Sequence, residues 1–80
     1  QRLLLVGERV DAALPRLDRF LDDALLHGFR QVEVVHGAGE GILRRAVRDF
    51  LAGHRGVTAF RGGDLGEGGD NITVVELRGE

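Results

Sequence analysis

Residues 31–51 have the sequence QVEVVHGAGEGILRRAVRDFL, and this stretch decides the fold. It begins with a short, mostly apolar run at 31–35 and passes through the glycine-rich segment HGAGEG at 36–41. It then continues into 42–51, where apolar residues recur three and four positions apart. That change of period predicts a strand, a turn and then an amphipathic helix. Three glycines in the turn permit left-handed or tightly bent backbone that a side chain would forbid.

A turn from strand to helix presents free backbone N–H groups at the positive end of a helix dipole, which attracts phosphate or carboxylate. We therefore predict an anion-binding site made by the turn and the arginines that follow it: Gly37, Ala38, Gly39, Glu40, Gly41, Arg44, Arg45 and Arg48. Arg44 and Arg45 stand in or next to the first helical turn, where a cation opposes the dipole, so stability alone does not account for them. Two plainer interpretations stay open, namely a tight turn without a ligand and a solvated surface pair between Arg45 and Asp49.

Composition restricts the class of protein. A chain of 80 residues can bury a single two-layer core, and the absence of cysteine excludes disulfides and thiolate metal sites. No apolar run approaches the roughly 20 residues of a membrane span, so we expect a cytoplasmic domain without a membrane partner. Because the sequence does not begin with methionine, we expect residues 1–80 to be one domain of a longer protein.

Charge is distributed unevenly along the chain. The formal net charge is −2, yet residues 27–61 carry six arginines against three acids, whereas residues 62–80 carry one arginine against five acids. Every basic residue is arginine, the side chain that grips phosphate with two parallel hydrogen bonds. The positive segment contains the glycine turn, so the anionic partner is expected there.

The order of elements predicts an α/β fold. Residues 3–6 predict a first strand, and a 3–4 spacing predicts a helix that begins near Val10 or Asp11, with Pro15 in or near its first turn and Gly28 as its C-terminal cap. Residues 57–60 and 72–77 predict two more strands, joined by a mobile, glycine-rich hairpin loop.

Right-handed crossovers then give a two-layer sandwich, β-α-β-α-β-β, with a mixed four-stranded sheet and both helices on one face. The first three strands run parallel and the last antiparallel, and the second sheet face is less well covered. We expect all four phenylalanines in the core, which leaves no aromatic platform for unpaired bases: Phe20, Phe29, Phe50 and Phe60.

The spacing of these landmarks resembles the Smr (small MutS-related) domain. The segment at 36–41 stands where that family has H-G-x-G-x-G, and residues 66–75 (GEGGDNITVV) resemble its glycine-rich approach to the last strand. The resemblance implies a fold similar to the C-terminal domain of bacterial translation initiation factor three. It also implies that the chain belongs to a longer MutS-like ATPase that dimerises and acts in DNA repair or in suppression of recombination.

Four positions depart from the family pattern. Leu4 and Val6 replace an acid and a His or Arg of the first strand, and Ala38 replaces a frequent lysine of the glycine turn. Asn71 replaces a glycine. If the two first-strand residues act in strand cleavage in relatives, this chain cannot use them.

The resemblance implies nicking or binding of branched or duplex DNA, and the alternative is a non-catalytic module that binds structured RNA or stalled ribosomes. His36 is the candidate acid or base for cleavage, although a lone histidine at a strand end is more often a structural hydrogen-bond donor that fixes the turn. We expect no cofactor and no protein-held metal. Substrate phosphates can bring a divalent ion, but the candidate oxygen ligands match no known spacing: Glu40, Asp64, Glu67 and Asp70.

Overall fold

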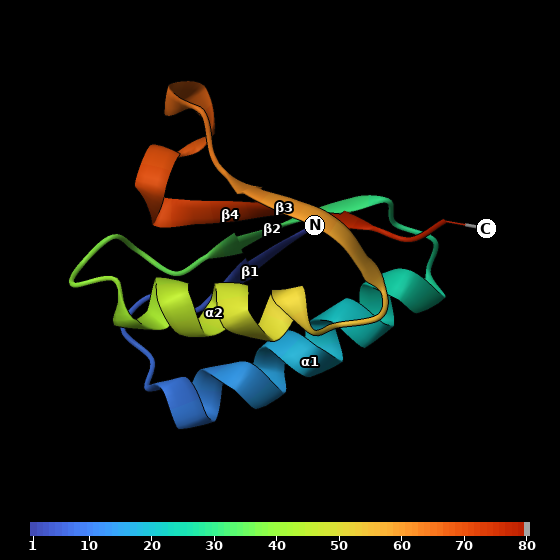
Figure 1. Cartoon of the computed structure of the whole chain (residues 1–80), viewed down its shortest axis with the longest axis horizontal. Helices are drawn as coiled ribbons and strands as arrows, with labels where there is room; N and C mark the ends of the chain where they lie inside the picture. Colours follow the sequence, from blue (N-terminus) through green and yellow to red (C-terminus); the bar gives the residue numbers. More distant parts are fainter. Residues whose placement is uncertain (80) are drawn as a thin grey trace.

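Four strands form one mixed sheet, and two helices cover one of its faces, as the computed structural model shows (Figure 1). The structure describes residues 1–79. The elements follow the predicted order, with two 3₁₀ turns added before the last strand: β1 (Arg2–Leu4), α1 (Val10–Leu26), β2 (Gln31–Val35), α2 (Ile42–Ala52), β3 (Val57–Gly62), η1 (Leu65–Glu67), η2 (Gly69–Asn71) and β4 (Ile72–Leu77).

The order of strands across the sheet is β1-β2-β4-β3. β1 pairs parallel with β2, while β4 lies between β2 and β3 and runs antiparallel to both. The first three strands therefore run in one direction and the last in the other, as predicted. This insertion of β4 brings residues 71–73 beside the end of β2, where the glycine turn begins.

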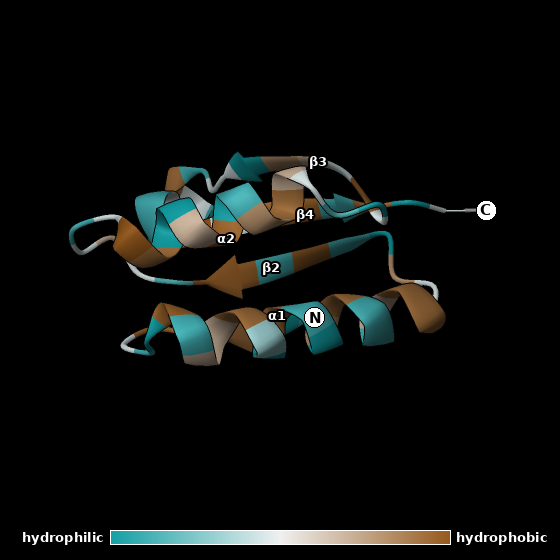
Figure 2. Cartoon of the chain, turned by 60° about the horizontal axis from the view of Figure 1, so that its bottom comes forward, coloured by the Kyte–Doolittle hydropathy of each residue, from teal (hydrophilic) through white to brown (hydrophobic). Residues whose placement is uncertain are grey.

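The core lies between the sheet and the two amphipathic helices, each of which carries both hydrophobic and hydrophilic residues along its length (Figure 2). Its members are aliphatic: Leu3, Leu5, Ala13, Leu17, Leu21, Ala24, Val32, Val34, Val47, Leu51, Val75 and Leu77. Phe20, Phe50 and Phe60 pack against this cluster as predicted, but Phe29 is 37% exposed and does not belong to it. No helix within residues 1–79 has the length and apolar character to cross a membrane.

Helix α1 begins at Val10 as predicted, and its end is closed by a Schellman motif. The N–H of Phe29 bonds to the carbonyl of Ala24 and that of Gly28 to Leu25, with Gly28 at φ +79°. Pro15 is the sixth residue of the helix, close to its first turn, as predicted. The first strand is shorter than predicted and ends at Leu4, although the N–H of Leu5 still bonds to the carbonyl of Val35.

The segment between β3 and β4 is pinned by its own hydrogen bonds, whereas its composition predicts a mobile loop. Asp64 and Glu67 form a reciprocal capping box, and Arg61 holds both carboxylate oxygens of Glu67 at 2.8 and 3.2 Å. These bonds keep the pKa of Glu67 at about 2. The glycines therefore shape two tight turns that cover Ile72 on the face opposite the helices.

Replacement of Gly63 by Ala tests this packing. A Cβ at Gly63 would lie 2.7 Å from Cγ1 of the buried Ile72, whereas a Cβ at Gly66 would meet nothing within 4 Å. We expect Gly63→Ala to lower the free energy of unfolding by about 1–3 kcal/mol through overpacking. The matched Gly66→Ala should change it by less than about 0.5 kcal/mol. Urea unfolding measures both, and equal effects of the two substitutions would contradict the packing described.

Candidate functional site

The glycine turn connects the end of β2 to the first residue of α2. Gly37, Gly39 and Gly41 have φ values of +81°, +39° and +82°, a region that other residues rarely adopt. Gly41 is the N-cap of α2 and offers no side chain to the first helical N–H groups. The turn therefore requires its glycines for backbone conformation and leaves the helix start uncapped.

Three N–H groups of the turn are used inside the protein. Those of His36 and Gly37 donate to the carbonyl oxygen of Asn71 at 3.0 and 2.9 Å, and that of Gly41 donates to Ala38 at 3.0 Å. Six others donate to no group within residues 1–79: the N–H groups of Ala38, Gly39, Glu40, Ile42, Leu43 and Arg44. Together with the positive end of the α2 dipole, they form a set of donors suited to an anion.

A shallow cavity of about 280 Å³ lies over this turn. Its walls come from the turn, the start of α2 and the segment after β1: Gly7, Glu8 and residues 36–44. Among the predicted site residues, the cavity thus gathers His36, the five residues that follow it, and Arg44. Arg45 and Arg48 do not line it.

The three predicted arginines occupy different places. The guanidinium of Arg44 folds back over the turn, so that a Cβ on Gly41 would lie 3.0 Å from its Nη2. Arg48, one helical turn later, donates from Nε to Oγ1 of Thr73 at 3.1 Å. Arg45 is exposed and forms no ion pair with Asp49 within the described chain, so the surface pair that we considered is not formed.

His36 is buried, with 4% of its surface exposed, and both of its ring nitrogens are engaged. Nδ1 lies 2.8 Å from the carbonyl oxygen of Gly37, and Nε2 lies 2.8 Å from Oγ1 of Thr73. A carbonyl can only accept, so Nδ1 carries the proton and Nε2 accepts from the Thr73 hydroxyl. Burial lowers the pKa of His36, and the positive charges of Arg48 and Arg44 lower it further, although the bond to Gly37 acts in the opposite direction.

Two residues of this region were not singled out in the sequence. Thr73 is fully buried and joins His36 to Arg48, and Glu8 lines the cavity while pairing with Arg16. The available signal for Thr73 was a polar residue near the start of the mostly apolar run Ile72–Leu77. Glu8 gave no signal, because a charged residue after a strand is ordinary in a surface loop.

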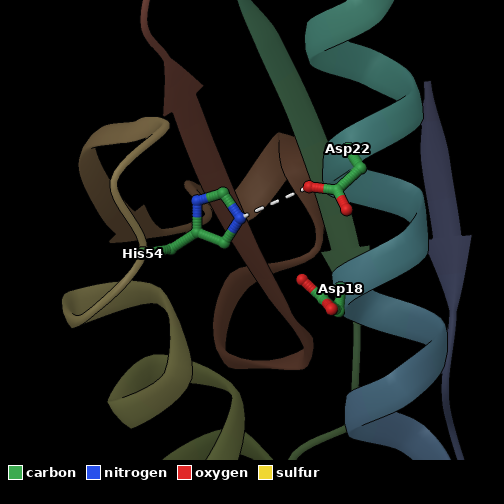
Figure 3. Close-up of side chains that lie close together, drawn as sticks. All are labelled: Asp18, Asp22 and His54. Atoms are coloured by element: carbon green, nitrogen blue, oxygen red, sulfur yellow. Dashed lines mark ion pairs between the residues drawn. The ribbon is translucent and has the colours of Figure 1, made fainter.

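The four candidate oxygen ligands named from the sequence form no metal-holding cluster within residues 1–79. Asp18, Asp22 and His54 do converge, with ligand atoms within 4.8 Å of one another (Figure 3). Nδ1 of His54 accepts from the N–H of Gly56 at 2.9 Å, so the neutral ring carries its proton on Nε2, which points to Oδ1 of Asp22 at 3.9 Å. A metal would need a lone pair on Nε2, so this cluster fits a contact between α1 and the end of α2 better than a metal site.

Comparisons with known proteins agree with this fold. The family model described as Smr domain matches residues 3–78. Endonuclease MutS2 of Bacillus cytotoxicus is 51% identical over 74 residues, which cover 92% of this chain but only 9% of that protein. The crystal structure of the Smr domain of Thermus thermophilus MutS2 superposes with a TM-score of 0.95 at 37% identity, covering 98% of both chains. YdaL, a stand-alone small MutS-related protein from Escherichia coli, gives 0.92 at 28% identity, covering 96% of this chain and 63% of YdaL.

The lowered pKa of His36 predicts a pH-dependent stability. Between the folded pKa and the unfolded value of about 6.5, the unfolded chain binds more protons, so the free energy of unfolding should fall as the pH drops through this window. His36→Gln removes the titrating group and should flatten that slope. Urea unfolding between about pH 7.5 and about pH 5.5 measures it. Identical slopes for the two proteins would show that His36 is protonated as easily in the folded chain as in the unfolded one.

Proposed function

Because the chain belongs to the Smr domain family, we propose that it is a nucleic-acid-binding module that holds a backbone phosphate of DNA in the cavity beside His36. The observation that carries this proposal is the set of six N–H groups in the glycine turn and the first turn of α2 that donate to nothing within residues 1–79, with the guanidinium of Arg44 above them. Backbone donors, a helix dipole and an arginine are complementary to phosphate oxygens.

The electrostatics of the site also favour the binding of an anion. Arg44 lies in the first turn of α2 and forms no ion pair within residues 1–79. Its charge opposes the helix dipole, and the positive charge of Arg48 lies nearby. A bound phosphate would turn this repulsion into attraction, and neutral His36 adds no further positive charge.

Replacement of Arg44 tests the phosphate contact. We expect Arg44→Gln to weaken binding of a labelled DNA duplex and to reduce the slope of log K against log salt by about 1, the change expected for one lost phosphate contact. Arg55→Gln is the matched control, because Arg55 follows the opposite end of α2. Fluorescence anisotropy over a series of salt concentrations measures both variants.

An equal loss in the two variants would point to general charge attraction rather than to this cavity. Binding that does not weaken with salt would instead favour a small phosphorylated ligand over a nucleic-acid backbone. A cavity that contacts only phosphate does not discriminate between DNA and RNA. Competition with the labelled duplex by an RNA hairpin or by ribosomes therefore tests the RNA alternative. A four-way DNA junction made from the same strands tests a preference for branched DNA.

Cleavage of DNA is the second candidate function, and the names of the endonuclease MutS2 relatives favour it. Hydrolysis of a phosphodiester needs a group that activates the nucleophile and one that protonates the leaving oxygen. Val6 lies beside the turn, with its Cγ1 3.6 Å from the position of a Cβ on Gly37, but it can do neither. His36 has both nitrogens engaged inside the protein. These features support binding more strongly than cleavage.

A plasmid relaxation assay decides between the two functions. We expect the chain to nick supercoiled DNA no faster than His36→Gln in Mg²⁺ or Mn²⁺, while the wild-type chain binds the duplex. A divalent ion is included because substrate phosphates can bring one. Nicking by the wild-type chain, abolished in a His36→Gln variant that still binds DNA, would make His36 the acid or base of an endonuclease.

A further inference from the structure

Thr73 is the second residue of β4 and lies at the centre of the sheet. It pairs with Val34 of β2 on one side and with Gly62 of β3 on the other. Its side chain faces the helix layer and is fully buried. Valine has nearly the same shape and suits a buried strand, so packing alone does not explain a hydroxyl at this position.

The Thr73 hydroxyl connects His36, which lines the cavity, to Arg48, which does not. Arg48 donates to it from Nε at 3.1 Å, and His36 Nε2 lies 2.8 Å from the same oxygen. Since Nδ1 of His36 donates to the carbonyl of Gly37, Nε2 has a lone pair and accepts a hydrogen bond from the Thr73 hydroxyl. The result is a chain of hydrogen bonds in one direction, from Arg48 through Thr73 and His36 to Gly37.

We propose that Thr73 is a positioning residue of the phosphate site, whose hydroxyl donates to Nε2 of the neutral His36 and orients the Arg48 guanidinium. With Nε engaged, Arg48 offers only its two Nη groups to a ligand, and its Nη2 lies 3.3 Å from the position of a Cβ on Gly62. With Nδ1 engaged, His36 holds the carbonyl of Gly37, directly before the N–H groups of Ala38 and Gly39, which have no acceptor in the described part of the chain. The part of this inference that concerns a ligand rests on the proposed function.

Protonation of His36 would break this chain of hydrogen bonds. Nε2 would become a donor, and Oγ1 of Thr73 would then accept hydrogen bonds from both His36 and Arg48. The hydroxyl proton would lose its present acceptor in a place that solvent does not reach. Thr73 therefore favours a neutral His36 that supports the turn.

The first test is the tautomer of His36 in the wild-type chain, measured by ¹⁵N NMR at about pH 7.5, where an unperturbed histidine is neutral. We expect a protonated Nδ1 and an unprotonated Nε2. A protonated Nε2 would overturn the proposal without any variant. This readout needs no nucleic acid, so it remains valid if the proposed function fails.

The second test compares Thr73→Val with Thr73→Ser. Valine removes the hydroxyl, so we expect the ¹⁵N resonance of the unprotonated Nε2 of His36 to shift and duplex affinity to fall about tenfold, the effect of losing one hydrogen bond to a charged group. Serine keeps the hydroxyl and should preserve both the Nε2 resonance and the affinity. Thr58→Val is the matched control, because the hydroxyl of Thr58 bonds to the carbonyl of Glu76 on the exposed strand β3.

The outcomes separate the two proposals. If Thr73→Val leaves both the Nε2 resonance and the affinity unchanged, Thr73 does not position the site. If Thr73→Val shifts the Nε2 resonance but the wild-type chain binds no nucleic acid, the proposed function fails while the role of Thr73 towards His36 stands. If Thr73→Val does not fold, the protonation state of Nε2 in the wild-type chain still decides, because a protonated Nε2 cannot accept from the hydroxyl.

Discussion

The carbonyl oxygen of Asn71 accepts hydrogen bonds from both His36 and Gly37, and the whole site depends on this contact. It ties the end of η2 to the first two residues of the glycine turn, so the chain must bend away from β4 immediately afterwards. His36 then lies opposite Thr73, and the next N–H groups face outward. One carbonyl that satisfies two donors therefore fixes which N–H groups are used inside the protein and which remain available to a ligand.

This contact exists because β4 is inserted between β2 and β3. Residues 36 and 73 are far apart in sequence, yet antiparallel pairing of Val34 with Thr73 brings them together. The order of elements predicts a mixed sheet, but neither periodicity nor composition specifies which strand is central. The sequence thus predicts the glycine turn and its arginines, while the buried partner of His36 becomes visible only once the strand order is known.

Contacts that depend on the folded geometry also explain the other differences between prediction and structure. Glycine content correctly predicts a turn between β3 and β4, but the capping box and the Arg61–Glu67 pair that pin it are formed by side chains whose geometry composition does not reveal. Phe29 is the last residue of the Schellman motif, so its N–H is fixed while its ring is left partly exposed.

The site combines a buried neutral group with permanent cations. Burial of a charged imidazole beside Arg44 and Arg48 would be costly, and the Thr73 hydroxyl favours the neutral form in which Nε2 accepts. The positive charge over the turn therefore comes from guanidiniums, which stay protonated at any physiological pH. Such a site would respond to salt far more than to pH. His36 then holds the backbone of the glycine turn in position, and the backbone N–H groups and arginines attract the anion.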